Sequence, residues 1–290
     1  MAVRPGKFTD QSVIRRVAAE PTIMLGAGTA LLLQIAHPKV AQGVADHSGF
    51  ESSPLPRLFG TLDYLGMVTF GTKEEAHRAA WNVLRRHDLV AGPGYSAHDP
   101  DLQCWVNATL FQTARLLYER TIGALPPDET ARYYEEFCFI ALLLGCPRER
   151  LPADVAAFDE YWATMVSTLE VTDAARRLAG AILRPPVVPW LTWPFAVVFR
   201  LLAVGLLPEP IRVGYALPWT PARQRWLTLV LGTIKAVMTV TPGVVRRWPM
   251  RASVPLFRRL RWRRYEGRAH SALGPRGLRS GSRQADSPRG

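Results

Sequence analysis

The chain has 290 residues, of which 48% are hydrophobic and 21% are charged, the composition of an ordinary globular protein with room for one large core. Its formal net charge is +12, but 13 arginines against two acidic residues fall between Arg246 and Gly290. The preceding body is therefore nearly neutral. Three cysteines without a C-x-x-C pair argue against a disulfide framework or a zinc finger and suit a reducing compartment.

The N-terminal residues and the most apolar stretch both bear on membrane insertion. Polar residues follow the first seven positions, so we expect no signal peptide there. The most apolar stretch, 187–207, contains two prolines and Arg200, and it lacks the roughly 20 uninterrupted apolar residues of a spanning helix. We therefore expect a cytoplasmic protein, with any membrane association peripheral.

The first strong helix signal follows Pro21. Residues 22–45 are apolar on nearly every side, a pattern typical of a buried helix. Pro38 interrupts this segment, and because proline lacks an N–H, we expect a kink that frees the carbonyl near Gln34. His37 lies beside the kink, where it is either part of a pocket wall or a member of a buried polar network.

Capping signals place the next helices. Thr72 and Glu75 form a capping box before a helix that reaches about residue 90, and 92–94 (Gly-Pro-Gly) ends it. Asp99-Pro100 starts a helix to about residue 122. Further helices are expected at 126–145, 152–169, 172–183, 194–206, 221–238 and 251–265. We find no sustained period-2 alternation, so the sequence predicts an all-α fold without strands.

The C-terminal end differs in composition from the rest. From Gly267 it is rich in Gly, Ser, Pro and Arg, so we predict a single multi-helix globular domain over 1–266 and a disordered basic tail over 267–290. The segment from Arg246 to Arg264 mixes arginines with aromatic residues. We expect peripheral contact with an anionic membrane there, and no specific nucleic-acid partner. A solvated tail without a partner is the alternative.

Five of the six histidines lie between positions 37 and 98. His87 continues the apolar stripe of the helix over 72–90, and Arg85 and Arg86 flank this stripe on other faces. An imidazole facing a core, flanked by arginines that could meet carboxylates, is typical of an axial haem ligand. A hydrogen-bonded core histidine is the alternative. A third hypothesis is a metal-dependent hydrolase using His37, His47, His87 and Asp88.

A series of short motifs runs in order through residues 20–220. They are LLQIAHPKVA (32–41), HS (47–48), RLFGT (57–61), FGT (70–72), RHDLVAG (86–92), DP (99–100), WV (105–106), LGCP (144–147), LP (151–152) and LP (207–208). In combination they resemble the family of MpaB-type oxygenases and rubber-cleaving latex-clearing proteins.

This resemblance implies an all-helical fold with haem b held in a pocket between helices. It matches His87 to the single proximal histidine of the haem iron, and Arg57 and Thr61 to a conserved pair that lines the haem pocket. The implied activity is that of a haem-dependent oxygenase using dioxygen on an apolar small molecule, unsaturated or isoprenoid-like. We expect Arg57, Thr61 and His37 to be the catalytic residues.

Two positions depart from the family pattern. Rubber-cleaving members carry a lysine directly before the threonine, where this chain has Gly60, and many relatives have Trp-Val-His where this chain ends the motif with Asn107. These departures disfavour a rubber substrate and leave the expected haem site intact. A haem-binding or lipid-binding protein without turnover is the alternative to an oxygenase.

Overall fold

The computed structural model describes residues 6–47, 55–184 and 193–248, and of residues 55–59 and 193–194 it describes the backbone alone. Residues Met1–Met250 form one compact unit. Its regular structure is almost entirely helical, which confirms the predicted all-α class. The predicted helix over 251–265, the domain end near residue 266 and the tail over 267–290 lie outside the described residues.

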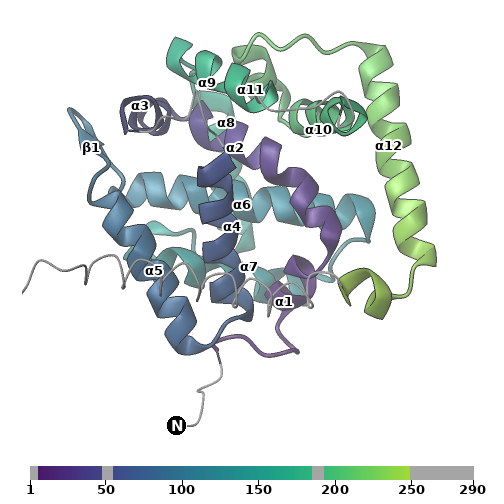
Figure 1. Ribbon diagram of the computed structural model, residues 1–290, viewed down its shortest axis with the longest axis horizontal. Coiled ribbons are helices and arrows are strands. Elements are labelled where there is room, and N and C mark those ends of the chain that lie inside the picture. Colours follow the sequence, from purple (N-terminus) through teal and green to yellow (C-terminus); the bar gives the residue numbers. More distant parts are fainter. Residues whose placement is uncertain (1–5, 48–54, 185–192, 249–290) are drawn as a thin grey trace, which may run out of the picture. The chain divides into compact units, whose positions relative to one another are not determined.

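Helices make up most of each described range (Figure 1). In chain order the elements are α1 (Val13–Ala18), the 3-10 helix η1 (Pro21–Gly26), α2 (Ala27–Ala36), α3 (Pro38–His47), α4 (Leu55–Phe70), α5 (Lys73–His87), β1 (Ala91–Gly92), β2 (Tyr95–Ser96), α6 (Pro100–Thr121), α7 (Pro127–Leu142), the 3-10 helix η3 (Arg148–Arg150), α8 (Val155–Thr168), α9 (Asp173–Leu183), α10 (Trp193–Gly205), α11 (Glu209–Gly214) and α12 (Pro221–Val240).

Helix α6 runs through the middle of the core (Figure 1). It begins as predicted, with the Asp99 side chain accepting from the Asp101 N–H at 2.9 Å and Pro100 in the first turn. Its Trp105, Phe111 and Leu117 are at most 1% exposed. Helices α2, α7 and α12 and the helix η1 pack against it. The helix therefore links the elements that surround the candidate site.

Helix α2 lies in the interior. Every residue from Gly28 to Ala36 is buried, as the all-round apolar pattern predicts. Within the described ranges, no single helix is both long and apolar enough to cross a membrane, although the bent pair Pro21–Ala36 and Pro38–His47 meets those two criteria jointly.

The expectation of a single helix over 22–45 is wrong. The structure has two helices, α2 and α3, which are separated at His37 and meet there at a bend of 102°. Pro38 has no N–H to offer the Gln34 carbonyl, and the His37 N–H turns to Gln34 O instead of Leu33 O. Both released carbonyls accept from the buried Trp105 indole, whose Nε1 lies 3.1 Å from Leu33 O and 3.3 Å from Gln34 O. The kink expected from Pro38 is confirmed, and α6 satisfies its backbone.

The expectation of no strands is also wrong, at one small hairpin. After α5 the chain forms β1 and β2, two residues each, paired with Ala91 opposite Ser96 and Gly92 opposite Tyr95. Gly94 takes a positive φ of 81° in the turn, a conformation that glycine reaches without strain. The helix expected to reach about residue 90 ends at His87, and the Gly-Pro-Gly signal marks the hairpin rather than the helix end. Strands of two residues are too short to show alternation.

Candidate functional site

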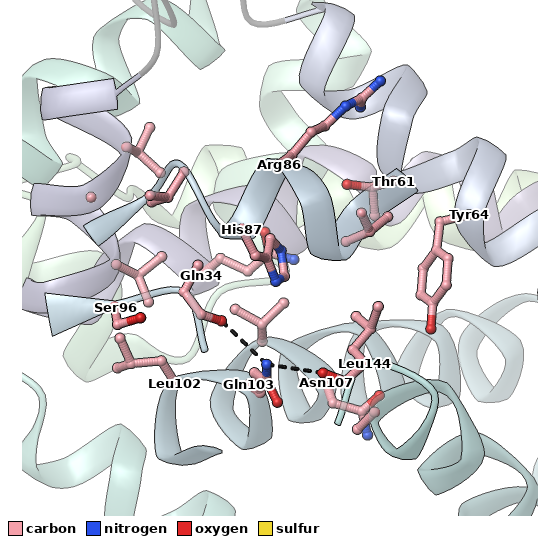
Figure 2. A pocket seen from close by; sticks show the side chains of 18 of the residues that line it. Gln34, Thr61, Tyr64, Arg86, His87, Ser96, Leu102, Gln103, Asn107 and Leu144 are labelled. Carbon is pink, nitrogen blue, oxygen red and sulfur yellow. Dashed lines mark hydrogen bonds between the residues drawn. The ribbon is translucent and has the colours of Figure 1, made fainter. Parts of the chain in front are cut away.

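Helix α5 positions His87. The helix begins at the predicted capping box, in which Thr72 Oγ1 accepts from the Glu75 N–H at 3.2 Å and Glu75 Oε2 accepts from the Thr72 N–H at 2.8 Å. Three buried residues, Ala76, Ala79 and Ala80, pack its inner face. His87 is the last residue of the helix, and its ring points into a cavity between α5 and α6 (Figure 2).

The cavity has a volume of about 250 Å³. Helices α2 to α7 and the hairpin all contribute to its wall. Most of the lining is apolar, with Val40, Val44, Val83, Leu102, Val106, Leu110, Ile140 and Leu144 among the contributing residues. Pockets for small molecules usually have about 300–1,000 Å³, apolar walls and a few fixed polar groups, so this cavity has the walls of such a pocket and a volume just below that range.

Helix α4 brings Thr61 to the same wall, and Gly60 beside it (Figure 2). A Cβ atom at Gly60 would lie 2.9 Å from Arg86 Nη1, so the guanidinium occupies the space that a side chain at position 60 would claim. Arg57 lies one turn earlier on α4, and its side chain is outside the described residues. The structure thus brings Thr61 and His87 together at one cavity.

Two amides on α6 face this region; the sequence marked Asn107 only as a departure from the family motif and did not mark Gln103. Gln103 and Asn107 line the cavity one helical turn apart and are 8% and 7% exposed. Gln103 Nε2 donates to Ala97 O at 3.2 Å and to Leu144 O at 3.3 Å (Figure 2). Gln103 Oε1 and Asn107 Oδ1 are buried and accept no hydrogen bond from the residues that the structure describes. Such atoms cost about 1–3 kcal/mol each, which favours a ligand that carries a donor.

His37 is placed differently from Thr61 and His87. It forms the break between α2 and α3, its Nδ1 accepts from the Lys39 N–H at 3.3 Å, and it is not among the described residues that line the cavity. Burial lowers the pKa of His37, and the nearby Lys39 cation lowers it further. Its neighbour Gln34 does line the cavity. His37 was expected either in a pocket wall or in a buried polar network. The structure places Gln34 in the cavity wall and His37 in the break between α2 and α3.

The remaining histidines of this region have local partners. His47 Nε2 lies 2.9 Å from Ala91 O, and His98 Nε2 lies 2.8 Å from Asp88 Oδ1. The rings of His87 and His98 meet edge to face with centroids 5.9 Å apart. In the part of the chain that the structure describes, no group of three or more His, Cys, Asp or Glu residues could hold a metal ion. The geometry gives the metal-hydrolase hypothesis no support.

A hydrogen bond fixes the hairpin against α3 and closes one side of the cavity. The Tyr95 hydroxyl donates to Asp46 Oδ2 at 2.7 Å, and Gln42 Nε2 donates to Asp46 Oδ1 at 2.7 Å. The bond to Asp46 raises the pKa of Tyr95 to about 12, and these two donors lower the pKa of Asp46. Because the pair joins residues 49 positions apart, no local pattern could have indicated it.

The donor set of the cavity fits a haem group. Among the described residues that line it, His87 is the only His, Cys, Asp or Glu. Haem iron needs as little as one protein ligand, whereas zinc held by protein alone takes three or four. Arg86 and Lys39 also line the cavity, and neither side chain forms an ion pair with a residue that the structure describes. Two such cations suit the carboxylates of haem propionates.

Comparison with known families agrees with this arrangement. Residues 14–236 match the family described as "ER-bound oxygenase mpaB/B'/Rubber oxygenase, catalytic domain". The match covers well over half of the chain, so the protein belongs to this family of oxygenase catalytic domains. The family resemblance drawn from the motifs is confirmed.

Two relatives from mycobacteria are similar over most of their length. They are "Uncharacterized protein Rv2237" of Mycobacterium tuberculosis and "Uncharacterized protein Mb2261" of Mycobacterium bovis. Each is 30% identical over 221 residues, which cover 72% of this chain and 87% of the relative. No solved structure matches the chain.

Proposed function

We propose that the protein is a haem b-dependent oxygenase that acts on an apolar small molecule, unsaturated or isoprenoid-like. The observation that carries the proposal is the lone imidazole of His87 in the apolar cavity, within an oxygenase-family chain. His87 would hold the haem, and the bound haem would supply the chemistry that activates dioxygen. The apolar wall matches a substrate with little polar surface.

Several residues would hold the cofactor. His87 is the proposed proximal ligand, and Arg86 and Lys39 are placed to pair with propionates. Family resemblance adds Arg57, which the α4 backbone places one turn before Thr61. Haem b, when bound, supplies the redox-active iron that activates dioxygen, chemistry that protein side chains do not provide.

The chain's own groups bind and orient the substrate. Burial of apolar substrate surface against these walls stabilises the complex by about 25 cal/mol for each Å² removed from water. The walls also keep water away from the reacting atoms. The Thr61 hydroxyl and the Asn107 amide are polar groups set in that wall, able to fix one polar end of a bound molecule. We assign His37 to support of the α2–α3 break, because Gln34 rather than His37 reaches the cavity.

An absorption spectrum of the purified protein tests the cofactor. We expect a Soret band and a pyridine haemochrome signal from wild type. The His87→Ala variant should lose the haem, because the cavity then retains no other imidazole among its described lining residues. His77→Ala is the matched control, since His77 is exposed on the same helix. Full haem occupancy in His87→Ala, or its loss in His37→Ala, would show that the wrong ligand was chosen.

Turnover separates an oxygenase from a haem- or lipid-binding protein without catalysis. Oxygen consumption by the haem-loaded protein is measured with an unsaturated isoprenoid alcohol and with its saturated analogue. The proposal expects consumption with the unsaturated compound alone. Haem binding together with no oxygen uptake on any alkene offered would favour the binding protein.

A further inference from the structure

Helix α12 is a long helix with a narrow attachment to the body. It has 20 residues, hence a length of about 30 Å. Thr220 caps it by accepting from the Arg223 N–H at 3.2 Å, and α12 packs on α6 and α10. Of its side chains only Leu227 and Leu231 are buried. Figure 1 shows α12 at the edge of the helical assembly.

The outward side of α12 carries large apolar residues. Trp226, Leu229, Val237 and Val240, here named the α12 stripe, are 61%, 58%, 49% and 80% exposed. Their spacings of three, eight and three residues put them on one face of the helix. Exposed apolar residues continue after the helix at Val244, Val245 and Trp248. Exposed large apolar side chains that share one helix face are typical of an interaction site.

The described segment that holds the α12 stripe carries charges of one sign. From Pro221 to Trp248 it contains five arginines and lysines and no aspartate or glutamate. On α12 itself, Arg223, Arg225 and Lys235 are exposed, and none forms an ion pair with a residue that the structure describes. This surface is complementary to an apolar layer edged with anions.

Two of the arginines expected to face a membrane do not contribute to that surface. Arg246 and Arg247 turn toward Glu20, with Nε atoms 2.7 Å and 3.8 Å from its carboxylate oxygens. Both side chains are less than a quarter exposed, at 17% and 24%. The first two cations of the segment expected to contact a membrane therefore bind the body of the protein instead.

We propose that the α12 stripe docks on the surface of an anionic lipid bilayer. The helix lies in the plane of the interface, with Trp226 and Leu229 among the upper acyl chains and the cations at the headgroups. Amphipathic helices of this type bury their apolar face about 5–10 Å deep, and tryptophan is enriched at that depth. A second copy of the chain is a poor occupant, because a two-fold contact would bring two unpaired sets of cations together.

The two parts of the attraction respond differently to salt. Attraction between cations and anionic lipid fades beyond a Debye length of about 10 Å at 0.1 M salt and about 3 Å at 1 M. Burial of the α12 stripe is not screened. Binding to anionic vesicles should weaken as salt rises but should not vanish, and weak binding to neutral vesicles should be independent of salt.

Flotation of the full chain with vesicles tests the proposal. The vesicles are phosphatidylcholine alone and phosphatidylcholine mixed with phosphatidylglycerol. Leu229→Gln with Val237→Gln removes apolar surface without changing charge, and we expect the partition coefficient to fall at least about tenfold on both vesicles. The matched control, Thr228→Gln with Thr239→Gln, changes exposed residues off the stripe and should stay within about twofold of wild type.

A second pair of substitutions isolates the charges. Arg225→Gln with Lys235→Gln should weaken binding to the anionic vesicles about 25-fold at low salt, or about fivefold for each cation, and leave neutral vesicles unchanged. Circular dichroism and thermal melting verify that every variant folds, which is expected because the substituted residues are exposed.

Several outcomes would overturn the proposal. One is a wild-type chain that floats with neither vesicle, and another is a stripe variant that floats as well as the control. Equal binding to both vesicles at low salt would reject the anionic surface. A dimer in light scattering that the stripe variant dissociates, with no vesicle binding, would assign the α12 stripe to a second copy.

Discussion

The ion pair between Glu20 and Arg246 joins the start of η1 to the segment after α12. Glu20 is fully buried, and Arg246 Nε lies 2.7 Å from its Oε2. Arg246 Nη1 also donates to Met238 O at 2.9 Å and to Thr241 O at 3.4 Å. Arg247 is the only other cation within ion-pair distance of Glu20 in the described residues, at 3.8 Å. The Arg246→Ala variant would leave a buried carboxylate with one distant partner.

Removal of one partner from a buried ion pair usually costs about 3–5 kcal/mol, because the other charge stays buried without compensation. Arg246 retains 17% exposure, and Arg247 can take over part of its role. We therefore expect the low end, a loss of about 3 kcal/mol from the free energy of unfolding. At about 2–4 °C of Tm per kcal/mol for a domain of this size, the Tm should fall by about 6–12 °C.

Thermal melting followed by circular dichroism measures the effect. Arg225→Ala is the control, because Arg225 is exposed on α12, and its loss should change the free energy by no more than about 0.5 kcal/mol. Glu20→Gln in the Arg246→Ala background should recover part of the loss, since it removes the buried charge. The reasoning would be refuted by an Arg246→Ala variant whose Tm lies within about 2 °C of the control's, well short of the expected fall.

Three further predictions follow from the same structure. Asn107→Leu should raise Tm by about 2 °C or more, because it removes a buried acceptor that no described residue satisfies, and a lower Tm in a melting scan would contradict this. Burial lowers the pKa of His37 in the folded protein, so the unfolded chain takes up a proton first and stability should fall as pH drops below about 6.5. Urea titrations across that range should show a flatter pH dependence for His37→Gln, and an unchanged slope would contradict it. Deletion of 267–290 should leave Tm and haem content unchanged, since the segment has few large apolar residues, and a large drop in Tm would show that it packs on the body.

Helix starts were predictable because they depend on neighbouring residues. Thr72 with Glu75, and Asp99 with Pro100, act within one turn, and both caps are present as predicted. The short helices α1 and α11 were missed, since six residues hold too little periodicity to register. Helix α12 was predicted over 221–238, but both of its faces are apolar, so the sequence did not indicate which one is exposed.

The candidate site was predictable in part. His87 continues an apolar stripe within one helix, and a motif match placed Thr61 near it. Asn107 was marked only as a departure from the family's Trp-Val-His motif, and Gln103 gave no signal, because polar residues on a buried helix acquire a role only from the helices that surround them. Arg246 shows the same limit, since its partner Glu20 lies 226 residues away in the sequence. For this reason the sequence placed Arg246 in a segment expected to contact an anionic membrane.

The shared hydrogen bond from Trp105 has a consequence for cooperativity. Helix ends ordinarily fray, so their amide protons exchange readily with solvent. The break at His37 is two helix ends at once, yet the indole of a residue with 0% exposure holds both of its released carbonyls. Opening of this break requires the buried Trp105 of α6 to lose its hydrogen bonds to the Leu33 and Gln34 carbonyls. Amide exchange around His37 should therefore be as slow as in α6, and α2, α3 and α6 should unfold as one unit.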